Sequence, residues 1–498
     1  MVLKYGLNEY LSEADNIYDL IVNCFGALCD NISNHQAFIS IYLGETDCKQ
    51  DNETDCIPCN PNINQLNEFS DRLMIEMTEY KIWNYSEIQK KIFKAIEELE
   101  LQTYMDEKQN QLTIIYCILA SIDSVAVNWQ KKWISRNLGP LDKQHKTSYR
   151  VYFNLGKTLH EEYIDNVHRN RVLSSSFFEE FQSFRFINET KWEKTTIPVV
   201  KYFTLPHELK DIFKKIRRIK IAVIPISCKK NFEFVPTAGS GQKVDYSQHN
   251  QKQLGQRVCS MIEAAVQAGS NIIVFPEYTI SPDIYAEIKN QLKKCHGELF
   301  FVFAGTTWSK DNNNVMHILN PWGELIGEYY KYTPFTKRKK GKYGYTIWEA
   351  LNSPGKICDI IAMENIGIFL PSICRDIIDD DYTSVLSRAL LPLFVIISAY
   401  SKSVASFEPR QTELANKYFV STVLGNACNA VKKSSVKIGN GSIIHKTNTI
   451  AGVKIEGIER NQCNVNEECK GCYYILDYNF TFENNINTDL YISRYELE

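Results

Sequence analysis

The chain has 498 residues, of which 44% are hydrophobic and 12% aromatic, so it can bury a large core, and a disordered chain is excluded. Its 56 lysines and arginines nearly balance 59 aspartates and glutamates, which excludes a general electrostatic attraction to nucleic acid. The longest apolar stretch, 389–400, is far shorter than the ~20 residues that span a bilayer, and we find no secretion signal. We therefore expect a soluble, cytoplasmic protein that has no membrane partner and contains two or three domains of roughly 150 residues each.

Up to residue 217 the sequence pattern is mainly helical. Segment 84–108 begins with an Asn and Ser cap and then shows an apolar stripe at helical spacing, and 112–133 and 159–170 also predict helices. Prolines with Asn and Asp neighbours predict a long loop at 44–66. No catalytic spacing occurs here, so we predict a mainly α domain whose role, in partner binding or in regulation, stays open.

Beyond residue 217 the pattern changes to strand, helix, strand. Residues 219–226 are rich in β-branched side chains and predict a buried strand, and the polar segment 229–250 predicts a loop. Residues 254–266 place apolar side chains on one helical face, which Gly269 ends. A second strand follows at 271–275. This order is a βαβ unit, which requires parallel neighbouring strands.

Further apolar segments predict a sheet-rich remainder. The predicted strands are 299–304, 315–319, 325–330, 366–370 and 393–399. Pro321, Trp322 and Gly323 predict a hairpin turn between two of them. Helices are predicted near 380–391 and 410–424. The fold class is therefore α/β.

Three polar residues stand at the ends of predicted strands, where side chains leave a sheet and can reach a cleft. Glu277 follows the strand at 271–275, Lys331 follows the second strand of the hairpin, and Cys374 lies between a strand and an acidic helix start. Taken singly, such a Glu or Lys is usually solvated and a lone Cys is usually buried in a core. Their order along successive strand ends indicates a shared site.

The sequence blocks around these residues resemble the nitrilase or carbon–nitrogen hydrolase superfamily. The blocks are Phe-Pro-Glu-Tyr at 275–278, the segment 320–331 that ends in Lys331, Ile-Cys-Arg-Asp at 373–376, the segment 410–426 and the glycine-led segment 439–444. The resemblance covers about residues 218–480. It implies that 218–498 folds as a four-layer α-β-β-α sandwich, assembles as a homodimer or larger oligomer, and needs no cofactor.

The chemistry of such a site is coherent. A thiolate attacks amide or nitrile carbons well, so Cys374 is the expected nucleophile and Glu277 the base that takes its proton. Lys331 and the backbone N–H of Arg375 would stabilise the oxyanion. The resemblance implies a further glutamate after the lysine that orients it. Glu349 is the best match, although a surface carboxylate would fit the same position.

Three other features leave alternatives open. The basic run 336–342 is either a solvated loop or a site for an anionic substrate or a nucleic-acid phosphate. The acidic residues at 376 and 379–381 fit a helix start better than a metal site. Two cysteine groups that end in C-x-x-C are either structural zinc sites or reduced surface loops, since a disulfide framework is not expected here. They are Cys48, Cys56, Cys59 and Cys463, Cys469, Cys472.

The favoured function is hydrolysis of a non-peptide C–N bond in a small amide or nitrile through a cysteine thioester, and acyl transfer to an amine would use the same residues. The alternative is a nitrilase-like scaffold or sensor, of the kind found in antiphage defence systems, which binds a ligand without turnover. Residues 377–381 and 400–403 depart from the common pattern of the superfamily. The substrate therefore stays open.

Overall fold

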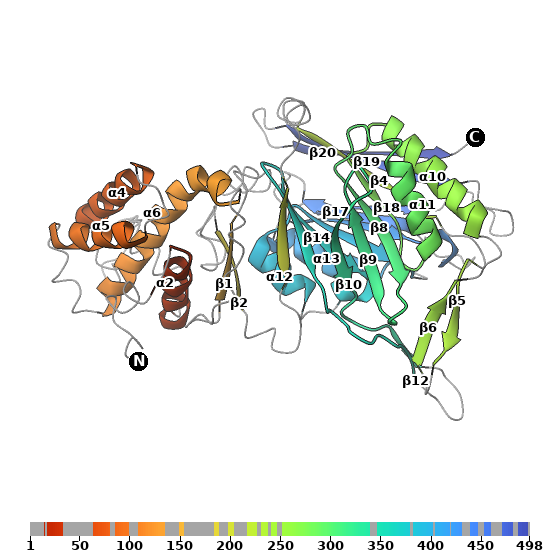
Figure 1. Ribbon diagram of the computed structural model, residues 1–498, viewed down its shortest axis with the longest axis horizontal. Coiled ribbons are helices and arrows are strands. Elements are labelled where there is room, and N and C mark those ends of the chain that lie inside the picture. Colours follow the sequence, from red (N-terminus) through yellow and green to blue (C-terminus); the bar gives the residue numbers. More distant parts are fainter. Residues whose placement is uncertain are drawn as a thin grey trace, which may run out of the picture. The chain divides into compact units, whose positions relative to one another are not determined.

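The chain forms two compact units, residues 1–193 and 194–498 (Figure 1). The computed structural model describes residues 14, 17–32, 63–79, 85–98, 108–134, 149–153 and 184–188 of the first unit. Of the second unit it describes residues 198–203, 217–226, 231–237, 241–246, 251–338, 346–378, 382–401, 404–418, 420–430, 439–446, 453–459, 471–481 and 487–496.

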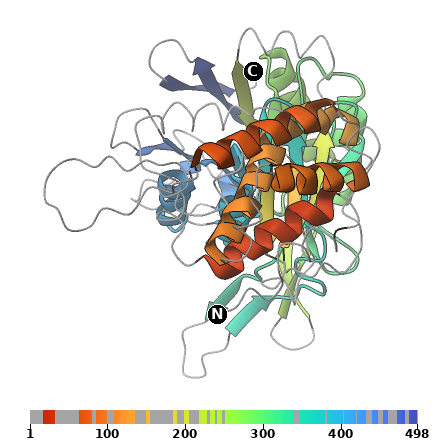
Figure 2. The same cartoon turned by 90° about the vertical axis from the view of Figure 1, so that its left-hand side faces the viewer.

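The described part of the first unit is mainly helical. Its helices are α2 (Ile17–Asn31), α4 (Ile63–Glu79), α5 (Tyr85–Glu98) and α6 (Lys108–Ile134). Helix α6 contacts α2 and α4, and α4 contacts α5; Figure 2 looks onto these helices. An antiparallel hairpin of β1 (Tyr149–Phe153) and β2 (Phe184–Asn188) joins this core, where Phe186 stacks on Phe25 at a ring-centroid distance of 3.5 Å.

Two predicted helices of this unit are found as α5 and α6. The loop predicted at 44–66 is wrong at its end, because helix α4 already begins at Ile63. The remaining part of that loop and the helix predicted at 159–170 lie outside the described residues. None of the helices in the described ranges combines the length and apolar character needed to cross a membrane.

The second unit is built on two seven-stranded sheets. The first has the strand order β10-β9-β8-β7-β4-β19-β20. These strands are β10 (Leu325–Tyr330), β9 (Asn314–Leu319), β8 (Phe301–Trp308), β7 (Ile272–Val274), β4 (Arg218–Val223), β19 (Cys472–Thr481) and β20 (Asn487–Glu496). Helices α10 (Gln251–Gln267) and α11 (Pro282–Leu292) bury their apolar faces in a core shared with β4, β7, β8 and β19.

The second sheet has the order β18-β17-β16-β15-β14-β13-β3. Its strands are β18 (Val453–Glu459), β17 (Gly439–Lys446), β16 (Ser421–Asn426), β15 (Phe394–Ala399), β14 (Gly367–Ile373), β13 (Asp359–Met363) and β3 (Val199–Phe203). Helix α12 (Thr383–Leu390) contacts β14, and α13 (Glu408–Tyr418) contacts β16, β17 and β18.

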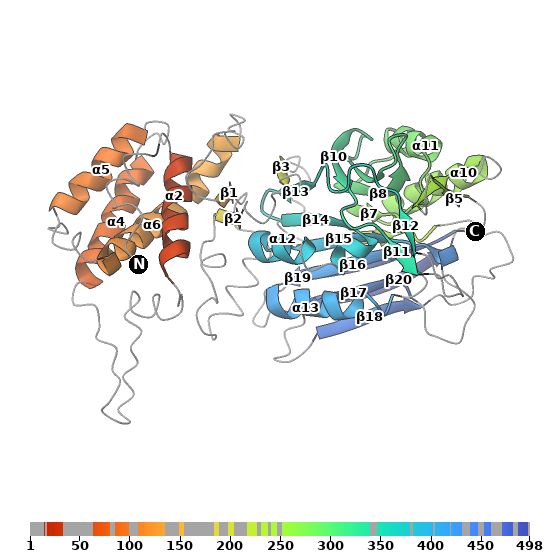
Figure 3. The ribbon, with the colours of Figure 1, turned by 90° about the horizontal axis from the view of Figure 1, so that it is seen from below.

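The two sheets pack face to face through apolar side chains. The rings of Phe301 and Phe369, from opposite sheets, lie 5.8 Å apart, and Gly425 of β16 lies against Val274 of β7. One helix pair, α10 and α11, belongs to the first sheet, and the other, α12 and α13, belongs to the second; Figure 3 shows the pairs well apart. The second unit is therefore the α-β-β-α sandwich expected of a nitrilase-like domain.

The predicted βαβ unit is confirmed by β4, α10 and the parallel strand β7, and the predicted hairpin by β9 and β10. The loop predicted at 229–250 is wrong, because it contains β5 (Glu233–Pro236) and β6 (Gly241–Asp245). These strands form a small sheet, in the order β11-β12-β6-β5, with β11 (Thr336–Arg338) and β12 (Thr346–Glu349). Strands β5 and β6 have only four and five residues, and the polar, Gly- and Ser-containing sequence around them resembles that of a loop.

Two other boundaries differ from the sequence prediction. The helix predicted at 410–424 ends at Tyr418, and strand β16 begins at Ser421. The predicted start of the second domain at 218 is later than the observed division at 193/194, because β3 already pairs with β13 in the second sheet. About 155 residues separate β3 from its partner strand β13, so the local sequence pattern placed β3 in the first domain.

Gly305 connects the first sheet to the strand end that carries Glu277. It lies at a bulge of β8 with φ at +64°, and a Cβ atom there would collide with the carbonyl oxygen of Pro276. We expect Gly305→Ala to lower the free energy of unfolding by about 2–4 kcal/mol, because left-handed strain and overpacking add. Urea unfolding of the full chain measures this loss.

Gly269→Ala is the matched control. Its φ is +75°, but the nearest atom to a new Cβ would be Lys220 Nζ at 3.4 Å, so only the strain of about 1–2 kcal/mol is expected. Equal losses in the two variants would contradict the steric argument for Gly305.

Candidate active site

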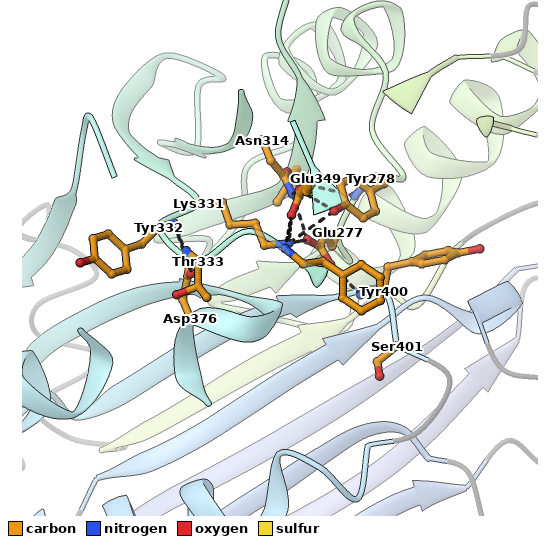
Figure 4. A network of polar contacts seen from close by, with 12 residues as sticks. Glu277, Tyr278, Asn314, Lys331, Tyr332, Thr333, Glu349, Asp376, Tyr400 and Ser401 are labelled. Atoms are coloured by element: carbon orange, nitrogen blue, oxygen red, sulfur yellow. Dashed lines mark hydrogen bonds and ion pairs between the residues drawn. The ribbon is translucent and has the colours of Figure 1, made fainter. Parts of the chain in front are cut away.

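A buried lysine lies between two buried carboxylates. The Nζ atom of Lys331 is 2.7 Å from Oε1 of Glu277 and 2.6 Å from Oε2 of Glu349 (Figure 4). All three residues are at most 5% exposed. The hydroxyl of Tyr278 lies 3.4 Å from the same Nζ. Because burial strengthens charge interactions, this pairing fixes the ammonium in one position.

Strand ends bring these residues together. Glu277 follows β7, and its N–H donates to the carbonyl of Ala399 at the end of β15 in the other sheet. Lys331 directly follows β10, and its N–H donates to the carbonyl of Asn314 on the paired strand. Glu349 is the last residue of β12. Its burial on a strand excludes the alternative that it is a surface carboxylate.

Each carboxylate is held by further donors. The side-chain amide of Asn314 donates to Oε1 of Glu277 and to Oε1 of Glu349, both at 2.9 Å. The hydroxyl of Tyr278 donates to Glu349 at 2.6 Å, and the N–H of Tyr400 donates to Oε2 of Glu277 at 3.0 Å. These donors stabilise the charged carboxylates and orient them toward Lys331.

The structure brings Cys374 to the same place. It begins a 3-10 helix (Cys374–Ile377) directly after β14, has φ at +49° and is 8% exposed. The Glu277 carboxyl group and the backbone of Tyr400 lie close enough to its thiol to shift the pKa of Cys374, Glu277 upward and the Tyr400 backbone downward. A non-glycine residue in the left-handed region at a strand end is strained, and such strain is concentrated at functional sites. The N–H of Arg375 lies in the first turn of the helix, where backbone donors have no partner within the helix.

Asp376 connects the nucleophile segment to the lysine segment. Its buried carboxylate accepts hydrogen bonds from the N–H of Thr333 at 2.6 Å, the N–H of Tyr332 at 3.2 Å and the hydroxyl of Tyr329 at 2.9 Å. Burial raises the pKa of Asp376 to about 7, although Lys331 and the N–H donors act in the opposite direction. This acid therefore fixes the backbone that follows Lys331.

The environment decides the resting protonation states. Burial raises the pKa of Glu277, and Glu349 raises it further, against the opposing effect of Lys331. Burial and the nearby Glu277 raise the pKa of Cys374 well above that of an ordinary thiol. Burial lowers the pKa of Lys331, but the two carboxylates outweigh it and the net direction is up. At neutral pH the Cys374 thiol is therefore protonated and the Lys331 amine is charged, and burial makes Glu277 a stronger proton acceptor than an ordinary carboxylate.

The acidic residues, the two cysteine groups and the basic run add no further residue to the candidate site within the described part of the chain. Within the described residues no group of His, Cys, Asp and Glu could hold a metal ion. Cys472 is a buried residue at the start of β19, and the other members of the two cysteine groups lie outside the described residues. In the basic run, Thr336 accepts a hydrogen bond from the Arg375 side chain at 2.8 Å, while 339–342 lie outside the described residues. Residues 379–381 lie outside them as well.

Sequence reasoning missed Asn314 and the roles of Tyr278, Tyr400 and Asp376. Asn314 opens β9 and Tyr400 directly follows β15, so the strand-end pattern that identified Glu277 and Lys331 applies to both. Tyr278 is next to Glu277 in the sequence. The role of Asp376 depends on backbone N–H groups 43 and 44 residues away, for which the sequence carries no signal.

No protein-family model matches the chain, and no curated protein matches it. Among solved structures, 123 chains match. An amidase from Nesterenkonia sp. AN1 is 10% identical, with a TM-score of 0.31, over 56% of this chain and 93% of that chain. A mutant of that amidase, described as from the nitrilase superfamily, is 9% identical with a TM-score of 0.32, over 56% of this chain and 92% of that chain. The C. elegans NitFhit protein is 15% identical with a TM-score of 0.35, over 56% of this chain and 61% of that chain.

The amidase structures come from the superfamily that the sequence blocks resemble, and these structures do not match the N-terminal region of this chain. Scores of this size carry no weight for the chemistry, so the roles of the residues depend on the geometry of the site alone.

Lys331→Met tests the electrostatic balance of the site. The substitution leaves Glu277 and Glu349 without their counter-charge, so we expect the free energy of unfolding at neutral pH to fall by about 3–5 kcal/mol. The pKa of Glu277 then rises further above its unfolded value. The variant therefore loses stability as the pH rises, and the difference in free energy of unfolding between wild type and Lys331→Met should shrink from pH 8 toward pH 5. Urea unfolding across this pH range measures it.

Lys417→Met is the matched control, since Lys417 pairs with Glu413 on the surface at 2.6 Å. Surface pairs contribute little, so a small and pH-independent change is expected. A deficit in Lys331→Met that does not vary with pH would contradict the assignment of a charged pair.

Proposed function

We propose that the second unit hydrolyses a non-peptide C–N bond, in an amide or nitrile, through a thioester at Cys374. The observation that carries the proposal is that the Glu277 carboxyl group pairs with the Lys331 ammonium at 2.7 Å in a buried site where the Cys374 thiol and Glu277 are close enough for each to shift the pKa of the other. A thiol, a carboxyl group and an ammonium gathered in one buried site are the groups that acyl transfer requires. Glu277, Lys331 and Cys374 are the proposed catalytic residues.

The raised pKa of Cys374 sets the order of events. Because the thiol is protonated at rest, its proton passes to Glu277 while sulfur attacks the substrate carbon. The negative charge moves to the substrate oxygen, next to the Lys331 ammonium and the N–H of Arg375. Glu277 then protonates the departing nitrogen as the C–N bond breaks. It next takes a proton from the water that attacks the thioester, and the acid product leaves with the thiol restored.

Glu349 acts as a positioning residue in this scheme. Its Oε2 lies 2.6 Å from Nζ of Lys331, and the side-chain amide of Asn314 connects the two carboxylates. With Glu349 as a second partner, Lys331 stays in place when Glu277 becomes neutral. A second hydrogen-bonding partner of this kind keeps the stabilising cation preorganised through each proton transfer.

The network also favours turnover over a scaffold without activity. Buried charges carry a desolvation penalty, and apolar residues of similar size are often as stabilising or more so. A domain that served only for assembly would have no use for a buried lysine, two buried carboxylates and a strained cysteine in contact. Their presence together is therefore best explained by chemistry.

Cys374→Ala is expected to lower the rate of amide hydrolysis on the order of a thousand-fold or more, because no other residue can form the thioester. Release of ammonia or amine from a library of amides, followed by mass spectrometry, measures the rate, and the acid product separates hydrolysis from transfer to an amine. Cys259→Ala on helix α10 is the control and should keep full activity. Equal activity in the wild type and in Cys374→Ala would refute the proposal.

The acid limb of the pH–rate profile should report Glu277, since only its ionised form accepts the thiol proton. The charge of Glu349 raises the pKa of Glu277. Glu349→Gln removes that charge, so we expect the acid limb of kcat/KM to move to lower pH even though the rate falls. Glu324→Gln, in the turn between β9 and β10, removes a distant charge and should leave the limb in place. A limb that moves upward in Glu349→Gln would contradict the assignment of the base.

A further inference from the structure

Four aromatic side chains form a cluster beside the proposed triad. We call Phe232, Phe234, Tyr278 and Tyr400 the aromatic wall. The ring centroid of Phe234 lies 5.4 Å from that of Tyr278 and 6.3 Å from that of Tyr400. The ring centroid of Phe232 lies 5.8 Å from that of Tyr278 and 5.1 Å from that of Tyr400. Most of these pairs are edge-to-face, which leaves ring faces available for a further planar group.

The aromatic wall is continuous with the reacting groups. The Nζ atom of Lys331 lies 5.5 Å from the centroid of the Tyr278 ring, and the hydroxyl of Tyr278 donates to Glu349. The N–H of Tyr400 donates to the Glu277 carboxylate at 3.0 Å, and the Tyr400 backbone lies close enough to the Cys374 thiol to lower its pKa. Figure 4 shows Tyr278 and Tyr400 on the same side of Lys331 as Glu277. A substrate whose reacting carbon lies at Cys374 therefore has these rings beside its substituents.

The outer part of the wall is uncovered. Phe234 is 42% exposed and Phe232 is half-buried, whereas Tyr278 is buried. Exposed large apolar side chains also occur on three segments that carry site residues. They are Phe335, whose N–H donates to Glu349 at 2.9 Å, Trp348, the neighbour of Glu349 on β12, and Ile378, four residues after Cys374. An aromatic cluster in contact with polar reacting groups, as the aromatic wall is through Tyr278, is typical of a substrate pocket.

We propose that the substrate is an amide or nitrile with a planar apolar group of aromatic size next to the reacting carbon, which packs against Phe234 and Phe232. This inference rests on the proposed function. The two phenylalanines offer no hydrogen bond, so they select for shape and apolar surface rather than for a polar group. The short β5 strand that carries Phe234 is the specificity element of the site, and Phe232 directly precedes it.

The planar group can belong to either side of the scissile bond, and two substrates distinguish these cases. Phenylacetamide places a benzyl group on the acyl side, and N-benzylacetamide places it on the amine side. Acetamide, which lacks the ring, is the reference. We expect the wild type to hydrolyse one of the two benzyl amides with a kcat/KM at least tenfold above that of acetamide.

Phe234→Ala should lower kcat/KM for that benzyl amide about tenfold, mainly through KM, and leave acetamide within twofold of the wild type. Phe234→Leu keeps apolar volume on β5, so its kcat/KM for the benzyl amide should lie between the values of the wild type and of Phe234→Ala. This intermediate value distinguishes the loss of the ring from a general loss of folding. Trp322→Ala is the matched control. This tryptophan is 48% exposed in the turn at the far end of the β9–β10 hairpin, and its loss should change neither substrate.

Equal loss for acetamide and the benzyl amide in Phe234→Ala would overturn the inference while the proposed function stands. A Phe234→Ala variant with unchanged kinetics but an altered oligomeric state would also overturn it, because the wall would then be a subunit interface. Absence of hydrolysis and of a Cys374 thioester with all three amides in the wild type would instead refute the proposed function, and the inference with it.

Discussion

The second unit depends on one buried interaction, the ammonium of Lys331 between the carboxylates of Glu277 and Glu349. Three charges removed from water carry a large desolvation penalty, which only close geometry and additional hydrogen bonds can offset. Asn314 and Tyr278 supply those bonds, together with backbone N–H groups. Removal of one of these orienting residues would therefore leave part of the desolvation penalty of the charges without compensation.

The position of this network explains the architecture around it. Apolar contacts such as Phe301 with Phe369 hold the two sheets together over most of their faces. At the site, polar contacts replace them: the Glu277 N–H bonds to Ala399 of the second sheet, and the Asp376 carboxylate bonds to the backbone after Lys331 of the first. The strand ends of both sheets thus meet at one edge. A shift of one sheet against the other would separate the nucleophile from its base.

The sequence predicted the parts of this arrangement that depend on local pattern. Apolar segments identified most central strands, and the polar residues at their ends identified Glu277, Lys331 and Cys374, which the structure brings together. Parts that depend on distant pairing were missed. Strand β19 lies beside β4 although some 250 residues separate them, and no local pattern reports such a pairing. The aromatic wall was missed because the segment with Phe232 and Phe234 has the composition of a loop, and only its pairing with β6 orders it.

The charge of the site and the aromatic wall both affect how easily charge can move during the proposed reaction. One ammonium against two carboxylates gives a net charge of minus one, so a thiolate formed in advance would add a second negative charge in a buried place. In the proposed mechanism, transfer of the thiol proton to Glu277 during the attack would keep the net charge constant and only move its location. Movement of charge is easiest where fixed groups rather than water respond to it. The ring of Tyr278 lies 5.5 Å from Nζ of Lys331, and an apolar substituent packed on the neighbouring Phe234 would exclude further water from the site. Binding of the substrate would therefore strengthen the electrostatic stabilisation on which its own reaction depends.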